Sequence, residues 1–302
     1  MSGFKYCVAL DIGGTNLRGT WLDFKGRRDK IFLKKRPQNL SGTKHALTLL
    51  IQKIIARCPE KPGIIAVASA GPLDVQKKCY LKTVNMPELD FFPIGSFLEE
   101  KFSLPVLLEN DAQAAALGEV TYGCLQGEDF ALVITLGTGV GTGVILDRKI
   151  WRAGHVTGPE LGHIFLGGEE LCGCGQQGCA ETLLNKRALL ALATKYGLTT
   201  TSVRTLINIG QQDKQKFIRL LQDYGARLGL FIAQLQVMLG LKNICICGGL
   251  AHFARLSHKF MRATLEKRLS QRSWWLPDTI KYSSNPDLSA LLGMLSLATK
   301  QY

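Results

Sequence analysis

Long apolar runs are missing from this 302-residue sequence. No stretch approaches the roughly 20 apolar residues that a bilayer crossing needs, and the most apolar one, 228–241, is interrupted by Gln234, Gln236 and Gly240. The N-terminus also lacks a basic segment followed by an apolar core and a small-residue cleavage site, which is the pattern of a secretory signal. These absences exclude a membrane-spanning protein, and we expect a soluble, cytoplasmic protein with no membrane partner.

Acidic residues are scarce as well, because 24 Asp and Glu stand against 37 Lys and Arg and give a net charge of +13. The basic residues concentrate in 204–281. We interpret these basic residues as a solvated helix surface. The alternative is that their positive electrostatic field attracts a phosphorylated ligand. A nucleic-acid footprint would also need a recognition module, and we identify none in the sequence, so we expect no nucleic-acid partner.

Composition excludes wholesale disorder, since 46% of the residues are hydrophobic and 20% are charged. At roughly 150 residues per domain, the length predicts two domains. Nine cysteines in a chain of this length, three of them between 172 and 179, do not resemble the framework of a small secreted domain. We therefore expect reduced thiols.

Two segments, 6–23 and 130–146, share one plan: an apolar strand, a glycine-rich turn and a second strand. Apolar patterns elsewhere predict strands at 63–71, 105–111 and 243–247 and helices at 46–56, 112–120, 181–196, 214–241 and 250–272. This order predicts an α/β architecture with two sheets, a cleft between them, and a domain boundary near 118–128. Ligands are expected at the strand ends.

The two glycine-rich turns are candidate phosphate-binding loops. Asp11-Ile-Gly-Gly-Thr-Asn16 joins a carboxylate at a strand end to two glycines and a hydroxyl residue, and 136–143 has glycine at every second position from 137. Glycine lets backbone N–H groups approach phosphate oxygens closely. Neither a Walker loop nor the Rossmann spacing is present. A simple hairpin turn is the alternative for either loop alone, but together they predict a nucleotide whose phosphates are held from both sides.

Glu109-Asn-Asp111 lies where a buried strand meets a helix. A carboxylate at this point can act as a general base on a substrate hydroxyl, with the neighbouring amide holding the same substrate. The alternative is that Asn110 or Asp111 only caps the helix, which is a common use of both residue types. The segment by itself leaves both interpretations open.

His163 and the segment Cys172-Gly-Cys-Gly-Gln-Gln-Gly-Cys179 form the most specific pattern in the chain. Three thiols separated by glycines and one imidazole nine residues upstream supply a Cys3His set for tetrahedral zinc. Four protein ligands close the coordination shell, which is typical of a structural site. Reduced cysteines without a metal are the alternative.

With these motifs assembled, the chain resembles sugar kinases of the ROK family (repressors, open reading frames, kinases), within the actin-like ATPase and hexokinase fold group. The resemblance runs nearly from end to end. It rests on Asp11-Ile-Gly-Gly-Thr-Asn16, Glu109-Asn-Asp-Ala112 with Ala-Leu-Gly-Glu119, Leu136-Gly-Thr-Gly-Val-Gly141, Glu160-Leu-Gly-His163 and Cys172-Gly-Cys-Gly-Gln-Gln-Gly-Cys-Ala-Glu181. It implies two actin-like ATPase (ribonuclease H-like) α/β domains with an interdomain cleft, 1–120 plus 286–302 and 121–285, the second with the zinc motif.

The resemblance also implies ATP-dependent phosphorylation of a hexose at its 6-hydroxyl, with Mg²⁺, a structural Zn²⁺ and a homodimer. Asp111 would accept the hydroxyl proton, and Asp11 would help to hold the magnesium. The residues implied to bind the sugar are Gly71, Asn85, Asn110, Asp111, Glu160, His163 and Glu181. Those implied to bind the nucleotide are Asp11, Gly13, Gly14, Thr15, Asn16, Gly137, Thr138, Gly139, Gly248 and Gly249. The implied zinc ligands are His163, Cys172, Cys174 and Cys179.

The sequence departs from the family pattern in two places. Pro159 stands where the family usually has glycine, just before a pocket residue, and Asp147-Arg-Lys replaces a common glycine. Because proline fixes its own φ and restricts the preceding residue, the pocket wall that reads the sugar can differ from that of relatives. Glucose is the first expectation for the sugar. N-acetylglucosamine, N-acetylmannosamine, fructose, mannose and allose are alternatives, and a phosphoryl donor other than ATP stays open.

Two non-enzymatic interpretations compete with the kinase. A sugar-responsive repressor of this family would carry a helix-turn-helix domain ahead of the kinase-like part, and the phosphate loop already begins at Asp11, so we disfavour it. A zinc-stabilised binding protein that has lost catalysis is the other, and substitution of Asp111 distinguishes it from the kinase.

Overall fold

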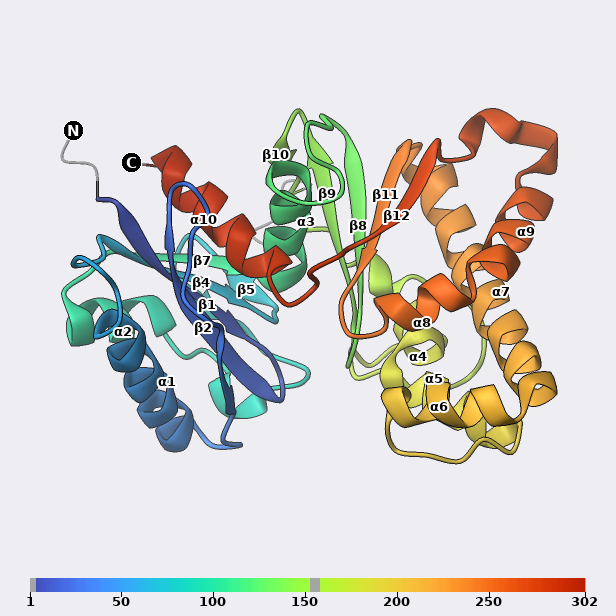
Figure 1. Ribbon diagram of the computed structural model, residues 1–302, viewed down its shortest axis with the longest axis horizontal. Helices are drawn as coiled ribbons and strands as arrows, with labels where there is room; N and C mark the ends of the chain where they lie inside the picture. Colours follow the sequence, from blue (N-terminus) through green and yellow to red (C-terminus); the bar gives the residue numbers. More distant parts are fainter. Residues whose placement is uncertain (1–3, 153–157, 302) are drawn as a thin grey trace. The chain divides into compact units, whose positions relative to one another are not determined.

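The computed structural model describes residues 4–152 and 158–301 and is shown in Figure 1. The chain divides into two compact units. The first contains the residues up to 127, 143–159 and those from 287 onward, and the second contains 128–142 and 160–286. Among the described residues, no helix has the length and apolar character needed to cross a membrane.

The first unit is built on a five-stranded sheet with the order β3-β2-β1-β4-β7. Strand β1 pairs antiparallel with β2 and parallel with β4, and β4 pairs parallel with β7. Its elements are β1 (Tyr6–Ile12), β2 (Asn16–Asp23), β3 (Phe32–Lys35), α1 (Leu40–Ile55), β4 (Ile64–Ser69), β5 (Leu73–Asp74), β6 (Cys79–Tyr80), the 3-10 helix η1 (Pro87–Leu89), α2 (Ile94–Phe102), β7 (Val106–Asn110), α3 (Asp111–Thr121), β10 (Lys149–Ile150) and α10 (Ser289–Gln301).

Helices cover both faces of this sheet, with α1 and α2 on one side and α3 and α10 on the other (Figure 1). Because successive side chains of a strand point to opposite faces, β1 serves both layers. Val8 and Leu10 pack into the cluster with α1 and α2, whereas Cys7 and Ala9 pack against α10. All six residues of β4 are buried, as expected for a parallel strand covered on both faces.

The second unit contains most of another five-stranded sheet, with the order β10-β9-β8-β11-β12. Strand β11 is parallel to both β8 and β12. The elements of this part of the chain are β8 (Ala131–Leu136), β9 (Val140–Leu146), which crosses into the first unit at residue 143, η2 (Leu161–His163), α4 (Ala180–Leu184), α5 (Lys186–Lys195), α6 (Val203–Gln212), α7 (Lys214–Leu239), β11 (Asn243–Cys247), α8 (Ala251–Leu256), α9 (His258–Arg268), η3 (Ser270–Trp275) and β12 (Thr279–Tyr282).

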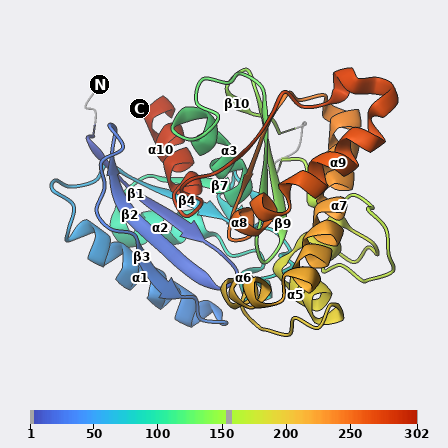
Figure 2. The same ribbon diagram turned by 45° about the vertical axis from the view of Figure 1, so that its right-hand side comes forward.

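The long helix α7 lies along α9, as both ribbon views show (Figure 2). Two glycines one helical turn apart, Gly225 and Gly229, permit this close approach. A Cβ on Gly225 would lie 2.8 Å from the Ser257 carbonyl oxygen, and one on Gly229 would lie 2.9 Å from the Thr264 Cβ. The small-residue surface of α7 therefore fixes the helix layer of the second unit.

The predicted strands at 63–71, 105–111 and 243–247 are confirmed as β4, β7 and β11, and the helix at 112–120 is confirmed as α3. Two of the predicted long helices are wrong because each is broken. The helix predicted at 181–196 breaks at Asn185, whose backbone is extended and whose side chain caps α5. The helix predicted at 250–272 breaks at Ser257, whose hydroxyl donates to the Phe253 and Ala254 carbonyls. After α9 the chain continues as the 3-10 helix η3.

Several elements were not predicted, namely β3, α2, α6 and β12. Strands β3 and β12 are four-residue strands at sheet edges, and each carries lysine, so their apolar signal is weak. The structure also groups 143–159 with the first unit rather than with 121–285, because β10 contacts α3 and Arg152 pairs with Glu109. Asp147 and Arg148, which replace a common glycine, both have positive φ values of 51° and 59°.

Candidate functional site

Three parallel strands of the first unit end at one edge of the sheet. Ile12 at the end of β1 lies opposite Ser69 at the end of β4, and Ser69 lies opposite Asn110 at the end of β7. A Cβ on Gly71 would be 3.4 Å from the Asn110 side-chain nitrogen, so these two residues are neighbours. In open α/β sheets, this carboxyl edge is where ligands bind.

The first glycine-rich turn leaves from the same edge, between β1 and β2. The Gly13 N–H donates to the Asn16 carbonyl oxygen over 2.9 Å, which closes the turn. Gly13, Gly14 and Asn16 are partly exposed and Thr15 is exposed, so the loop is accessible to a ligand. A Cβ on Gly14 would lie 3.9 Å from the Cβ of Asn85, which places this predicted sugar-binding residue beside the predicted phosphate loop.

Asp11, the residue expected to help hold magnesium, is paired with an arginine that we did not predict. Asp11 and Arg18 are partners in the β1–β2 register, and an Arg18 guanidinium nitrogen lies 3.2 Å from an Asp11 carboxylate oxygen. A second Arg18 nitrogen lies 3.2 Å from Asp287. Burial raises the pKa of Asp11 above its ordinary value, and the charge and hydrogen bond of Arg18 oppose this rise.

The capping interpretation of the segment at Asn110 and Asp111 is confirmed for Asn110. Its side-chain oxygen accepts hydrogen bonds from the N–H groups of Ala112 (3.0 Å) and Gln113 (3.1 Å) at the start of α3. Asp111 is the first residue of that helix, and one of its oxygens accepts from the Ala112 N–H over 2.8 Å. The N-terminal end of the helix dipole favours negative charge at this position. Capping by Asn110 therefore positions Asp111, and it does not exclude a further role for Asp111.

Glu109, just before these residues, is almost fully buried at 1% exposure. Its carboxylate accepts from the Asn110 N–H over 2.9 Å and from an Arg152 guanidinium nitrogen over 3.0 Å, and a second Arg152 nitrogen also bonds to it. The hydrogen bond that Arg152 donates to Glu109 raises the pKa of Arg152. This ion pair holds the end of β7 against the segment after β10.

In the second unit, the turn at Gly137, Thr138 and Gly139 joins β8 to β9 and contacts Glu181. The Gly137 N–H donates to the Gly139 carbonyl over 3.0 Å, and a Glu181 carboxylate oxygen accepts from the Val140 N–H over 2.9 Å. A Cβ on Gly139 would come within 2.5 Å of that Glu181 oxygen. The structure therefore brings the predicted phosphate turn of this unit together with one of its predicted sugar-binding residues.

The remaining predicted residues of the second unit surround the same turn. Glu160 precedes η2 and His163 is its last residue. Burial raises the pKa of Glu160, with His163 opposing and Glu181 reinforcing the rise. Gly248 follows β11 with φ of 86°, where a Cβ would lie 2.5 Å from the Leu136 carbonyl oxygen at the end of β8. Gly249, next to it, has open space around its Cα.

The four predicted zinc ligands lie together. Their ligand atoms are all within 4.8 Å of one another, with Cys172 Sγ 3.5 Å from His163 Nδ1 and Cys174 Sγ 3.6 Å from Cys179 Sγ. Around a tetrahedral zinc, bond lengths of about 2.3 Å to sulfur and 2.0 Å to nitrogen would separate two sulfurs by about 3.8 Å and sulfur from nitrogen by about 3.5 Å. The two short separations match these values, so the donor set fits the metal.

The chain around these cysteines is shaped for such a cluster. Gly175 and Gly178 have φ values of 91° and 69°, which other residues adopt only with strain, and they turn the segment back on itself. Burial, reinforced by the neighbouring thiols, raises the pKa of Cys179 to about 12. A bound cation would therefore have to displace a proton to gain a thiolate ligand.

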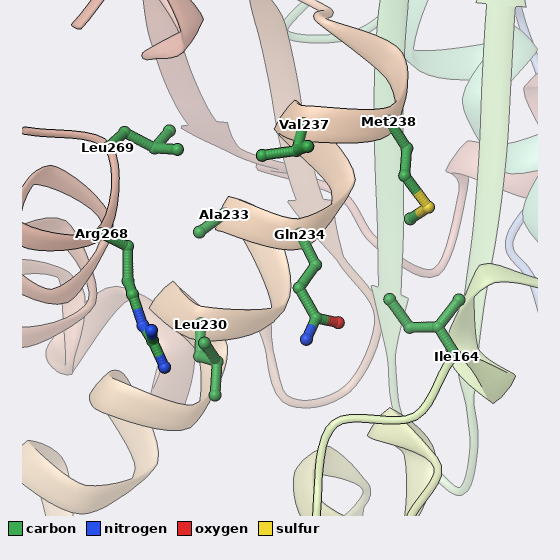
Figure 3. Close-up of a pocket in the computed structure, with 8 residues that line it drawn as sticks. All are labelled: Ile164, Leu230, Ala233, Gln234, Val237, Met238, Arg268 and Leu269. Atoms are coloured by element: carbon green, nitrogen blue, oxygen red, sulfur yellow. The ribbon is translucent and has the colours of Figure 1, made fainter. Parts of the chain in front are cut away.

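A groove of about 410 Å³ lies in the second unit, apart from the predicted residues (Figure 3). Helix α7 supplies most of its wall, and the groove is mainly apolar, with one amide and one guanidinium. Val237 and Met238 in this wall are each 53% exposed. The residues that line it are Ile164, Leu230, Ala233, Gln234, Val237, Met238, Arg268 and Leu269.

Comparisons with known proteins agree with this arrangement. The sequence model of the ROK family matches residues 7–301. The chain is 29% identical over 235 residues to the xylose repressor of Bacillus spizizenii. The matched region covers 74% of this chain and 59% of the repressor, so the chain spans about three fifths of that relative's length.

Two solved structures are similar over almost the whole chain. A ROK hexokinase from Thermus thermophilus is 30% identical with a TM-score of 0.82, covering 98% of this chain and 100% of that one. A ROK family glucokinase from Streptomyces griseus, solved in complex with glucose and AMPPNP, is 26% identical with a TM-score of 0.85, covering 98% and 99%. The expected α/β fold of the actin-like ATPase group is confirmed.

The buried pair of Glu109 and Arg152 yields a stability prediction. Arg152→Met would leave the Glu109 carboxylate buried without its cation. We expect the free energy of unfolding to fall by about 2–3 kcal/mol, less than for a fully buried pair because Arg152 is one-third exposed. In urea unfolding, Glu109→Gln combined with Arg152→Met should recover at least half of the loss. Lys5→Met, which breaks an exposed pair with Glu60, should leave the free energy of unfolding close to that of the wild type. Equal losses in Arg152→Met and Lys5→Met would contradict the assignment.

Proposed function

Because this chain belongs to the ROK family, we propose that it is an ATP-dependent kinase that phosphorylates the 6-hydroxyl of a hexose, with glucose as the substrate. The observation that carries this proposal is the shared strand edge of the first unit. That edge gathers the glycine-rich turn after Asp11, Gly71 and Asn85 with the Asn110-Asp111 start of α3. A phosphate loop beside a positioned carboxylate is what phosphoryl transfer to a hydroxyl requires.

Asp111 is the proposed general base. At neutral pH an aspartate is ionised and can take the proton of the sugar hydroxyl as the phosphoryl group is transferred. The residues proposed to hold the sugar are Gly71, Asn85, Asn110 and Asp111 of the first unit and Glu160, His163 and Glu181 of the second. Their carboxylates, amides and imidazole are suited to hydrogen bonding with sugar hydroxyls.

The proposed nucleotide site uses the glycine-rich turns. The backbone N–H groups of Gly13, Gly14, Thr15 and Asn16 and of Gly137, Thr138 and Gly139 would bind phosphate oxygens, and Gly248 and Gly249 would lie near the adenosine. Asp11 would help to hold Mg²⁺, which neutralises phosphate charge when it is bound. In the structure, the Arg18 guanidinium places a positive charge beside the largely buried Asp11 carboxylate.

The first experiment measures ADP release with ATP and Mg²⁺ against glucose, mannose, fructose, allose, N-acetylglucosamine and N-acetylmannosamine. We expect kcat/KM for glucose to exceed the others by about a hundredfold, or about 2.7 kcal/mol of discrimination. A preference for another sugar would leave the kinase and replace the substrate. The xylose repressors among the relatives supply the competing function: no turnover, with sugar-sensitive binding to genomic DNA fragments that resists salt, would replace the kinase with a repressor.

Asp111→Asn tests the catalytic assignment on the same assay. The amide keeps the size of the side chain but cannot take the proton, so kcat should fall by about 10²–10⁴-fold while the sugar dissociation constant changes by less than about threefold. Glu100→Gln, an exposed carboxyl on α2, is the matched control and should leave both values unchanged. Unaltered turnover in Asp111→Asn would remove Asp111 from the mechanism.

We also propose that His163, Cys172, Cys174 and Cys179 bind one structural Zn²⁺ per chain. The separations of their ligand atoms support this, as does the closed set of four protein ligands. His163 would then orient the sugar-binding residues around it while the metal takes no part in the reaction.

Cys174→Ser should abolish the bound zinc, measured by elemental analysis of the purified protein. The sugar KM should rise by about tenfold or more, because His163 loses its fixed orientation. Cys58→Ser changes a cysteine outside the cluster and should retain one zinc and the original KM. A Cys174→Ser protein with full zinc content would show that this thiol is not a ligand.

For the assembled protein we propose a homodimer that acts in the cytoplasm. The family resemblance supports the dimer, and the half-exposed Val237 and Met238 of the groove are apolar side chains that a second copy would cover. Light scattering should give a mass near twice the 33.2 kDa of one chain. Val237→Glu should lower this mass toward that of a single chain. A wild-type mass of one chain at micromolar concentration would contradict the dimer.

A further inference from the structure

Arg36, the residue after β3, has a side chain that is completely buried. Arginine is rarely buried unless it is paired, so its partners carry information. Its guanidinium donates to the carbonyl oxygens of Gly13 (3.0 Å), Gly14 (2.8 Å) and Pro37 (3.3 Å) and to the Glu88 carboxylate. Its own backbone N–H donates to the Thr15 carbonyl over 2.9 Å.

These bonds fix the direction of the turn that follows Asp11. The single cis peptide among the described residues is Gly71-Pro72, so the peptides of the turn are trans. In a trans peptide, the carbonyl and the following N–H point in opposite directions. Arg36 draws the Gly13 and Gly14 carbonyls inward, and the N–H groups of Gly14 and Thr15 therefore point to the other side. The turn itself is accessible, since Gly13, Gly14 and Asn16 are partly exposed and Thr15 is exposed.

Glu88 connects the same guanidinium to a second loop. Glu88 lies on η1, three residues after Asn85, and Asn85 contacts the turn at Gly14. The Glu88 side chain is only 16% exposed, so its bond to Arg36 is shielded from water and stronger than a surface pair. One planar cation thus holds together a turn assigned to phosphate and a loop assigned to sugar.

We propose that Arg36 is a positioning residue that couples nucleotide binding to sugar binding, an inference that rests on the proposed kinase function. Its fork orients the N–H groups of the phosphate turn, and its bond to Glu88 transmits any displacement of that turn to the loop of Asn85. Lysine cannot replace it, because a single ammonium group lacks the fixed planar arrangement of donors. Each ligand is then expected to strengthen the binding of the other by the same factor.

The test is calorimetric binding of AMPPNP with Mg²⁺, in the absence and presence of saturating glucose. For the wild type we expect glucose to strengthen nucleotide binding by at least fivefold. Glu88→Gln keeps the arginine at the turn but removes the charged link, so nucleotide affinity alone should change by less than threefold while the coupling falls below twofold. Arg36→Lys should weaken nucleotide binding by about tenfold and abolish the coupling. Arg57→Lys, on an exposed arginine paired with Asp29, is the matched control and should bind and couple as the wild type does.

The outcomes separate the two proposals. Wild-type coupling in Glu88→Gln, or unchanged nucleotide binding in Arg36→Lys, would overturn the role of Arg36 and leave the kinase intact. A Glu88→Gln protein that loses nucleotide affinity as strongly as Arg36→Lys would also overturn it, since the effect would then be general loosening of the fold. A wild type that binds neither ligand and turns over no sugar would overturn the proposed function and the inference with it.

Discussion

The register of three parallel strands is the constraint on which the rest of the first unit depends. Ile12, Ser69 and Asn110 are aligned across β1, β4 and β7, so the segments that follow them meet although they are far apart in sequence. A slip of one residue between β4 and β7 would turn every side chain of β7 to the opposite face. Glu109, now buried against Arg152, would then replace Asn110 at the edge. The packing of β7 opposes this slip, because Val106 and Leu108 are buried in the cluster that also contains residues of α1 and α2.

Paired charges stabilise this edge. Three arginines of the first unit each bind a carboxylate that has a proposed ligand role or lies within three residues of a residue that has one: Arg18 binds Asp11, Arg36 binds Glu88 and Arg152 binds Glu109. Burial raises the pKa of Asp11, and the charge and hydrogen bond of Arg18 oppose this rise. The basic residues of the chain are thus partly structural, because these three arginines pair with carboxylates of the first unit.

The motifs were easier to predict from the sequence than the arginines that pair with carboxylates near them. The four residues proposed to bind zinc are close in the chain, and the glycine turns follow apolar strands, so the local pattern was sufficient to predict both motifs. Arg18 had a readable signal, because counting back across the first hairpin pairs it with Asp11. Arg36 and Arg152 had none, since Glu88 and Glu109 lie 52 and 43 residues away from them. The breaks at Asn185 and Ser257 were missed for a different reason, because neither involves a glycine or a proline. The Asn185 side chain accepts from the Ala188 N–H and caps the start of α5, whereas the Ser257 hydroxyl donates to the Ala254 carbonyl at the end of α8.

The start of α3 shows why a capping residue and a functional residue can share one short motif. Asn110 satisfies the N–H groups of Ala112 and Gln113, and this sets the residue at which the helix begins. Asp111 then occupies the first helical position, where its backbone is fixed and the helix dipole favours its charge. Capping by Asn110 and the proposed role of Asp111 as general base are therefore compatible within one arrangement. If Asn110 did not cap the helix, the first turn would fray, and Asp111 would lose the fixed position that a general base needs.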